Sequence, residues 1–190
     1  ITVKSSAAAN RVMRTVTRWI ERKLGLKVNA KKSKVTRPMK LKYLGFSFVK
    51  MKGTWEARPH ISAIQAFKRK LKQLTKRSWS ISITERIKRL NSVIRGWINY
   101  FRMGKMKTHM KRIDERLRSR IRIIIWKQWK TRQKRLWGLR KLGVPEWMAI
   151  KSVGFHDHYQ AVAKTSGLRR VTKQILAKRG LISCLDYYLN

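Results

Sequence analysis

The residues that could support catalysis or hold a metal ion are few in this sequence, and they do not gather. Its 190 residues include only eight scattered carboxylates: Glu21, Glu56, Glu85, Asp114, Glu115, Glu146, Asp157 and Asp186. A two-metal phosphoryl-transfer site needs several acidic ligands around its metals. Asp114 and Glu115 are adjacent in a helical pattern, so they point in different directions, and each has Arg or Lys nearby. We predict local charge balancing for this pair.

Histidine and cysteine offer no better candidates. His156-Asp157-His158 is the one ligand-like cluster, but histidines two positions apart do not share a helix face, so we expect Asp157 to begin a helix. Cys184 is the only cysteine and stands in an apolar run, which predicts a small buried side chain and excludes a cysteine zinc site. The ten glycines are scattered and form no phosphate loop. The sequence thus predicts no catalytic residue and no metal site.

Charge predicts the partner. The chain has 49 Lys and Arg residues and a formal net charge of +41, so self-repulsion should destabilise it unless a polyanion binds. Its hydrophobic fraction of 43% is enough for real cores, which argues against a disordered basic tail. A membrane surface would need a free apolar helix face, whereas the apolar faces here can cover one another. Eight Trp and five Tyr residues suit stacking on bases. We therefore predict that the chain binds a nucleic acid and does not bind a membrane.

The residue pattern of segment 82–104 predicts an amphipathic helix, and we expect the rest of the chain to pack around it. Apolar residues recur at three- and four-residue steps from Ile83 to Phe101, which is the period of one helix face. Ser82 and Glu85 fit a capping box, and Gly104 is a plausible stop. Lys and Arg occupy the other sides.

Further helices are expected on both sides of this segment. One begins at residue 61, with Ser62 and Gln65 as a capping box, and another runs over 107–130. Three amphipathic helices with short links indicate a bundle. Shorter helices over 133–142, 145–152, 156–164 and 168–178 predict a small helical module after it.

The first third has mixed patterns. A helix is expected over 6–24, ended by Gly25, and strands over 40–50 and 54–59 are expected to form a hairpin around Lys52-Gly53. Val28 and Val35 are further strand candidates, and the opening ITVKSS reads as the end of a strand. The predicted fold class is therefore mainly α with a small α+β N-terminal part.

Several stretches resemble the reverse transcriptase and maturase proteins encoded by group II introns. GLKVNAKKSKV at 25–35 and KYLGFSF at 42–48 are similar to the last palm blocks of that family. RSWSISITERIKRLNSVIRGWINYF at 77–101 and RIRIIIWKQWK at 120–130 resemble its thumb, or maturase X region. LRKLGVP at 139–145 and GLISCLDYYLN at 180–190 resemble its C-terminal DNA-binding region.

The resemblance implies an architecture and a function. It implies a remnant of the palm at 1–60, a three-helix thumb bundle at 61–130 and a basic helical DNA-binding module at 131–190. Full-length relatives are RNA-directed DNA polymerases that use Mg²⁺, but the sequence starts after the family's Tyr-Ala-Asp-Asp turn. We therefore expect this chain to be inactive alone, to hold no cofactor, and to bind intron RNA in splicing and retrotransposition.

The resemblance also implies partners and a location. Group II intron RNA is the first partner, with a DNA target, an RNA–DNA duplex and the remaining fingers and palm as others. The implied location is a bacterial cytoplasmic ribonucleoprotein, with an organelle as the alternative.

Two sets of site residues follow. Tyr43, Leu44, Gly45 and Phe46 match the family block near the primer terminus, where Gly45 would admit a close backbone strand; a plain bend with Phe46 in the core is the alternative. Helix positions off the apolar stripes are expected to touch phosphate and 2′-hydroxyl groups with little reading of bases. This predicted RNA-binding set is Arg86, Arg89, Arg95, Asn99, Arg102, Lys111, Arg116, Arg120, Lys127 and Lys130.

Two other readings remain open at this point. One is a structural RNA-binding protein of ribosomal type, which composition alone would fit. The other is half of a polymerase completed by another chain. The YLGF block at 43–46 favours the intron-encoded family over the ribosomal type.

Overall fold

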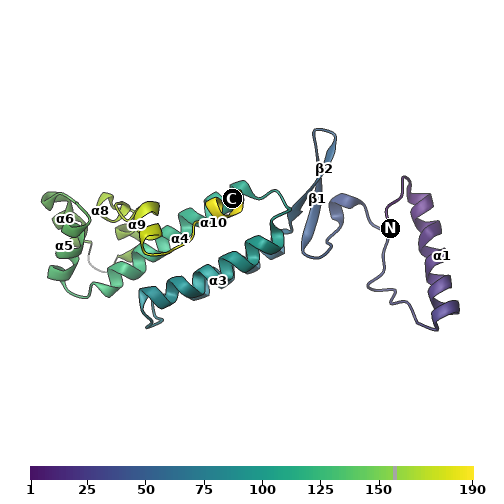
Figure 1. Cartoon of the computed structure of the whole chain (residues 1–190), viewed down its shortest axis with the longest axis horizontal. Helices are drawn as coiled ribbons and strands as arrows, with labels where there is room; N and C mark the ends of the chain where they lie inside the picture. The colour runs from purple at the N-terminus through teal and green to yellow at the C-terminus, as the bar shows by residue number, and fades with distance from the viewer. Residues whose placement is uncertain (156–157) are drawn as a thin grey trace.

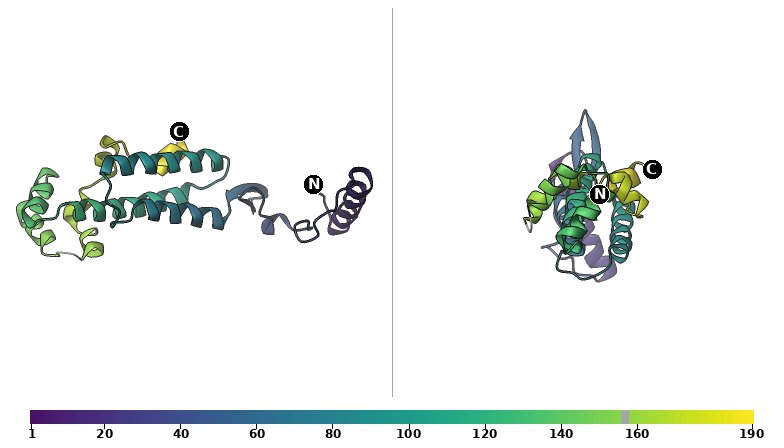
Figure 2. Two further views of the ribbon diagram at one scale, coloured as in Figure 1. Left: turned by 90° about the horizontal axis from the view of Figure 1, so that it is seen from below. Right: turned by 90° about the vertical axis from the view of Figure 1, so that its left-hand side faces the viewer.

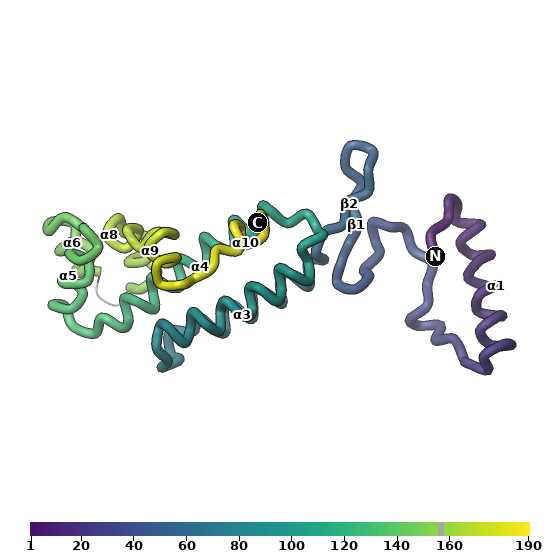
Figure 3. Tube along the Cα trace, viewed as in Figure 1, coloured from purple at the N-terminus to yellow at the C-terminus, as the bar shows by residue number. Residues whose placement is uncertain are grey.

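The structure, a computed structural model, describes residues 1–155 and 158–190 and is mainly helical there, as the sequence predicts. Figures 1 and 3 show an elongated arrangement with the N-terminal helix at one end and the short C-terminal helices toward the other. The elements are α1 Ser6–Leu24, η1 Pro38–Lys40, β1 Phe46–Met51, β2 Thr54–Pro59, α2 Ile61–Leu74, α3 Ile83–Phe101, α4 Lys107–Gln128, α5 Arg132–Lys141, α6 Glu146–Val153, α7 Tyr159–Val162, α8 Ser166–Arg169, α9 Lys173–Lys178 and α10 Cys184–Leu189.

Helix α1 stands apart from the bundle, as Figures 1 and 2 show. Ser5 caps its start by accepting a hydrogen bond from the Ala8 amide, and Gly25 follows its end with φ of 64°. No residue of α1 is buried. The strands expected near ITVKSS, Val28 and Val35 are wrong, because a strand needs a hydrogen-bonded neighbour and the described residues pair only β1 with β2, apart from one isolated bridge.

The predicted hairpin is present but begins later than expected. β1 and β2 are antiparallel, from Phe46 opposite Pro59 to Met51 opposite Thr54. Lys52 and Gly53 join them with φ values of 50° and 83°, the left-handed pair of a two-residue hairpin turn whose twist matches the strands. Residues 40–45 are not part of β1, because η1 occupies 38–40 and a second tight turn directly precedes Phe46.

Helices α2, α3 and α4 form the predicted bundle. Ser82 caps α3 by accepting from the Glu85 amide at 3.1 Å, but the Glu85 carboxylate pairs with Arg89, so only half of the expected capping box forms. The capping box expected at Ser62 is wrong, because His60 is the N-cap of α2 and its Nδ1 accepts from the Ser62 amide.

The C-terminal part forms shorter helices than the pattern predicts. His156 and Asp157 lie outside the described residues, and the helix expected over 156–164 is reduced to α7. The helix expected over 168–178 is split into α8 and α9 by residues 170–172. Each piece starts at a threonine, Thr165 or Thr172, whose hydroxyl accepts a hydrogen bond from a backbone amide three residues on. Helix α10 was not predicted.

The hydrophobic core runs from the bundle into this C-terminal part. Ile94 and Ile121 of the bundle belong to the same buried cluster as Leu139, Leu168 and Cys184. Helix α10 packs on both α3 and α4. The packing therefore continues across residues 130 and 131, while the division into parts at 1–60, 61–130 and 131–190 stays a prediction.

Candidate nucleic-acid interface

An exposed polar and basic row runs along α3. Lys88, Ser92, Arg95, Asn99 and Arg102 recur at steps of three and four and are all exposed. At 1.5 Å per residue, this row spans about 21 Å. Arg95, Asn99 and Arg102 make no hydrogen bond or ion pair with any described residue, so their polar groups are available to a ligand. We call these five residues the α3 row.

Contacts on α3 fix the direction in which this row faces. Trp97 stacks on Phe67 of α2, with ring centroids 4.5 Å apart and planes 7° apart. On another side of α3, the Asn91 side chain donates to the Gly180 carbonyl and accepts from the Ile182 amide. Two residues on a helix differ by about 200°, so Arg95 and Asn99 lie opposite Trp97. The α3 row therefore faces away from α2.

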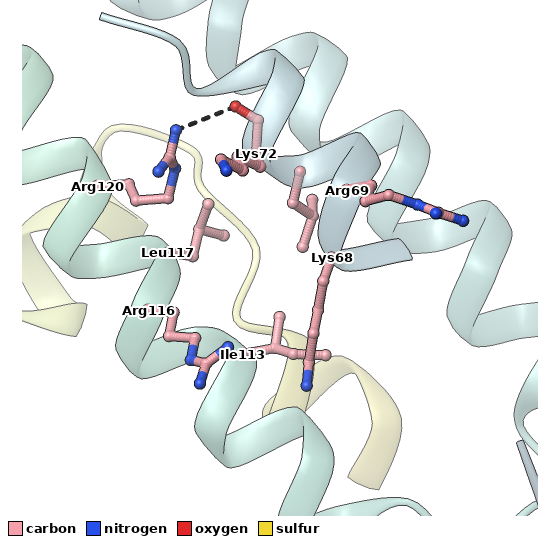
Figure 4. Close-up of a pocket in the computed structure, with 8 residues that line it drawn as sticks. Lys68, Arg69, Lys72, Ile113, Arg116, Leu117 and Arg120 are labelled. Atoms are coloured by element: carbon pink, nitrogen blue, oxygen red, sulfur yellow. Dashed lines mark hydrogen bonds between the residues drawn. The ribbon is translucent and has the colours of Figure 1, made fainter. Parts of the chain in front are cut away.

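A second cationic surface is a groove between α2 and α4, shown in Figure 4. Its volume is about 230 Å³, and no carboxylate lines it. It is lined by Leu71, Ile113 and Leu117 together with Lys68, Arg69, Lys72, Arg116 and Arg120. We call it the α2–α4 groove. Among the predicted RNA-binding residues, Arg116 and Arg120 line this groove, whereas Arg95, Asn99 and Arg102 lie on the α3 row, which faces away from α2.

His109 lies on α4 outside the lining of the α2–α4 groove. Burial, followed by the nearby charges of Lys68, Arg112 and Arg58, lowers the pKa of His109. Both causes favour the neutral form of this histidine.

Arg86 is not on an outward surface, and that expectation is wrong. Its side chain is 1% exposed, and its guanidinium donates to the carbonyls of Leu74, Lys76 and Trp79, the last at 2.6 Å. It lies seven and eleven residues before Val93 and Trp97, on the side of α3 that meets α2. Burial lowers the pKa of Arg86. It secures the turn between α2 and α3.

Arg120 and Arg89 also have partners within the chain. The Arg120 guanidinium donates to the Thr75 hydroxyl at 2.5 Å and to the carbonyls of Lys72 and Thr75 at 3.1 Å, so it holds the end of α2. Burial lowers the pKa of Arg120. Arg89 pairs with Glu85 at 2.6 Å and lies over the Trp79 ring. Both are less available to a ligand than the sequence indicates.

The remaining predicted cations are exposed but not all together. By helical spacing, Lys127 shares the side of α4 that carries Arg116, whereas Lys111 lies about 140° from Arg116 around the helix. Lys130 follows the end of α4. All four are exposed and make no hydrogen bond or ion pair with the described residues.

The predicted primer-proximal block is a tight turn packed on the end of α3. Tyr43 and Phe46 exchange backbone hydrogen bonds of 3.1 and 2.8 Å, and Leu44 and Gly45 between them have φ of 47° and 80°. A Cβ at Gly45 would lie 3.1 Å from the Phe101 ring. The close approach at Gly45 is therefore to Phe101. Tyr43 and Leu44 are exposed and remain accessible.

Asp114 has a structural role that the sequence did not indicate. It is 6% exposed, and its carboxylate accepts from the Ser183 hydroxyl and from the amides of Cys184 and Leu185. The predicted local charge balancing is wrong for Asp114, because its partners lie about 70 residues away at the start of α10. Glu115 is exposed beside it and has no such contact.

Neither a metal-binding cluster nor a membrane-spanning helix occurs among the described residues. Within residues 1–155 and 158–190, no group of three His, Cys, Asp or Glu side chains could hold a metal ion. Across the same residues, every helix is too short or too polar to cross a bilayer.

Fold and charge together define a class: a helical bundle whose exposed sides carry many unpaired cations. Residues 64–143 match the model of a protein family described as "Group II intron, maturase-specific domain". The chain therefore contains a group II intron maturase-specific domain, which spans α2 from Ile64 through α5 to Gly143. No curated protein matches the chain. The α3 row and the α2–α4 groove both lie inside this domain.

Proposed function

We propose that the chain is the thumb and C-terminal part of a group II intron reverse transcriptase/maturase, which binds intron RNA and so assists splicing and retrotransposition. The main support for this proposal is that the maturase-specific domain includes both cationic surfaces, the α3 row and the α2–α4 groove. The family assignment also favours this function over a structural protein of ribosomal type.

The α3 row supports binding to an RNA backbone. Arg95, Asn99 and Arg102 stand on an ordered helix with no internal partner, so binding need not break an existing ion pair. A rigid row about 21 Å long can contact several phosphate and ribose groups along one strand. Such contacts position an RNA without reading its sequence, which suits a protein that stabilises a folded RNA.

Other parts of the chain fit further partners of this proposal. Trp19 and Leu24 of α1 are 55% and 53% exposed, and no residue of that helix is buried. An amphipathic helix with an uncovered apolar side needs a cover, and the remaining fingers and palm would supply it. A DNA target and an RNA–DNA duplex are proposed for the same basic surfaces. The site of action would then be a bacterial cytoplasmic ribonucleoprotein, with an organelle as the alternative, and Mg²⁺ would belong to the full-length polymerase.

The test is the salt dependence of binding to a group II intron RNA. Each phosphate contact releases counterions, so log K should fall linearly with log salt, with about 0.7 to 0.9 of slope per contact. The double variant Arg95→Ala/Arg102→Ala should therefore reduce the slope by about 1.4 to 1.8. Circular dichroism should show an unchanged helical content, because both side chains are exposed and unpaired.

A charge-matched control separates a surface from an effect of total charge. Lys31→Ala/Lys32→Ala removes two exposed cations from the turn after α1. This control should change the slope by less than half as much. An affinity that is flat between low and high salt, or an equal effect of the two double variants, would refute the proposal that the α3 row binds RNA.

A further inference from the structure

The α2–α4 groove has an apolar floor that backbone binding does not use. Leu71 of α2 and Ile113 and Leu117 of α4 form its base and are 5%, 2% and 3% exposed. The aliphatic stems of the lining Lys and Arg side chains extend this apolar surface toward the rim. The volume of about 230 Å³ is below the roughly 300 to 1,000 Å³ of pockets for drug-sized ligands. A small flat group is therefore the size of occupant that this groove can admit.

Free cations stand at the rim of the same groove. In Figure 4, Lys68 from α2 and Arg116 from α4 both extend toward the Ile113 end, while Arg69 points away. Lys68 and Arg116 make no hydrogen bond or ion pair with the described residues. Arg120 closes the other end, where it is tied to the Lys72 carbonyl at 3.1 Å. The rim thus offers positive charge on both sides of an apolar space, and no acidic residue lines it.

We propose that the α2–α4 groove receives one unpaired nucleotide extruded from an RNA helix, with its base against the aliphatic lining of the groove and its flanking phosphates on Lys68 and Arg116. The inference rests on the proposed RNA binding and names the RNA feature that this surface selects. A base has an apolar face and is flanked by two anionic phosphates. The base would match the apolar lining of the groove, and the phosphates would match the cations on its rim. A fully paired helix would present only its backbone and leave the floor empty.

Extruded nucleotides are also the ones that can enter at least cost. Taking a base out of a duplex requires unstacking and unpairing, and the cost is lowest where the base is already unpaired. An intact duplex would still bind by its phosphates, since the rim is cationic. The structure therefore predicts a preference for a bulged helix over a paired helix, on top of an affinity common to both.

The experiment compares two RNA hairpins that differ only at one 2-aminopurine, which is bulged in one and paired in the other. The bulged hairpin should bind about tenfold more tightly at fixed ionic strength, at the low end of what one seated base contributes to single-strand binding, because the floor is aliphatic. The emission of the bulged 2-aminopurine should change on binding, and that of the paired one should not. Equal affinities for the two hairpins would overturn the proposal.

Two charge-matched variants locate the preference. Arg116→Ala removes a rim cation, whereas Arg95→Ala removes an exposed cation of the α3 row, which is not part of the groove lining. Arg116→Ala should reduce the preference for the bulged hairpin from about tenfold to about threefold or less. Arg95→Ala should weaken both hairpins alike and keep the preference. The reverse pattern would overturn the assignment to this groove.

Cross-linking of the unaltered chain gives a second measurement, which does not depend on whether a variant folds. With 4-thiouridine at the bulge, ultraviolet cross-links should map to residues 68–72 or 113–120. Cross-links confined to the α3 row or to α5 and α6 would refute binding of the unpaired nucleotide in the α2–α4 groove. If both hairpins bind equally with steep salt dependence, this inference fails and the proposed RNA binding stands. If neither binds in a salt-dependent way, both fail.

Discussion

Replacing Asp114 by alanine is expected to free α10 from the bundle. The Asp114 carboxylate accepts three hydrogen bonds at the start of that helix, at 2.8 Å from the Ser183 hydroxyl, 2.8 Å from the Cys184 amide and 2.9 Å from the Leu185 amide. The amides are first-turn donors that have no partner within the helix. A negative charge at a helix N-terminus is favoured as well. One buried side chain therefore satisfies the beginning of α10.

The size of the effect follows from the bonds that are lost. A hydrogen bond to a charged group contributes about 1.5 to 3 kcal/mol, and the Ser183 hydroxyl can turn toward another partner. Two orphaned amides at the lower value give about 3 kcal/mol for Asp114→Ala. Asp114→Asn keeps one acceptor oxygen and should cost about half of that. With a slope of about 2 kcal/mol/M, the alanine variant should lower the urea midpoint by about 1.5 M.

The assay is urea unfolding with amide hydrogen exchange, and Glu115→Ala is the control. Urea is uncharged and does not screen charges, and each variant raises the net charge of +41 by one, so the added self-repulsion is the same in both. Glu115→Ala removes the same charge from the next position but loses no hydrogen bond, so it should cost about 0.5 kcal/mol or less. Exchange should accelerate at residues 184–189 in Asp114→Ala only. Equal shifts in the two variants would refute the reasoning, because total charge would then explain both.

Three further predictions test other contacts. Arg86→Ala should destabilise the chain by about 3 kcal/mol in urea, because three carbonyls lose a charged donor, whereas Arg95→Ala should change stability by about 0.5 kcal/mol or less. Gly138→Ala should lower the midpoint of thermal unfolding, since its Cβ would lie 2.4 Å from the Trp129 ring, while Gly96→Ala on open helix surface should raise it. Burial raises the pKa of the Cys184 thiol above its ordinary 9.0, so the free energy of unfolding should be unaffected by this group below about pH 9 and fall above it by about 1.4 kcal/mol per pH unit, a slope that Cys184→Ala should remove in urea titrations.

The long helices could be predicted from the sequence because their periodicity is local. The segments 6–24, 82–104 and 107–130 anticipate α1, α3 and α4 to within three residues at either end. The shorter helices were harder, since four to six residues cannot show a period. Helix α10 is the clearest example: its first turn is stabilised by Asp114, about 70 residues earlier, and that contact leaves no trace in the local pattern.

The candidate site was only partly predictable, for a related reason. Helical spacing correctly separates Arg95, Asn99 and Arg102 from the apolar side of α3. It cannot separate an arginine that meets solvent from one that meets the end of another helix. Arg86 and Arg120 look alike in the sequence, and both turn toward the last carbonyls of α2. The α2–α4 groove likewise needs two helices that are placed only by packing.

The shortage of carboxylates explains why several arginine side chains bind backbone carbonyls at helix ends. Eight acidic residues cannot pair with 49 cations, so helix ends take their place: the C-terminal carbonyls of a helix carry partial negative charge and lack partners. Arg86 and Arg120 bind the end of α2, and Arg122 binds the Arg169 and Val171 carbonyls at the end of α8. Lys68, Arg95, Arg102 and Arg116 have no such partner and stay available on the α3 row and on the rim of the α2–α4 groove. Substitutions of these four cations should therefore separate binding from stability, whereas substitutions of Arg86 or Arg120 at the end of α2 should affect stability as well.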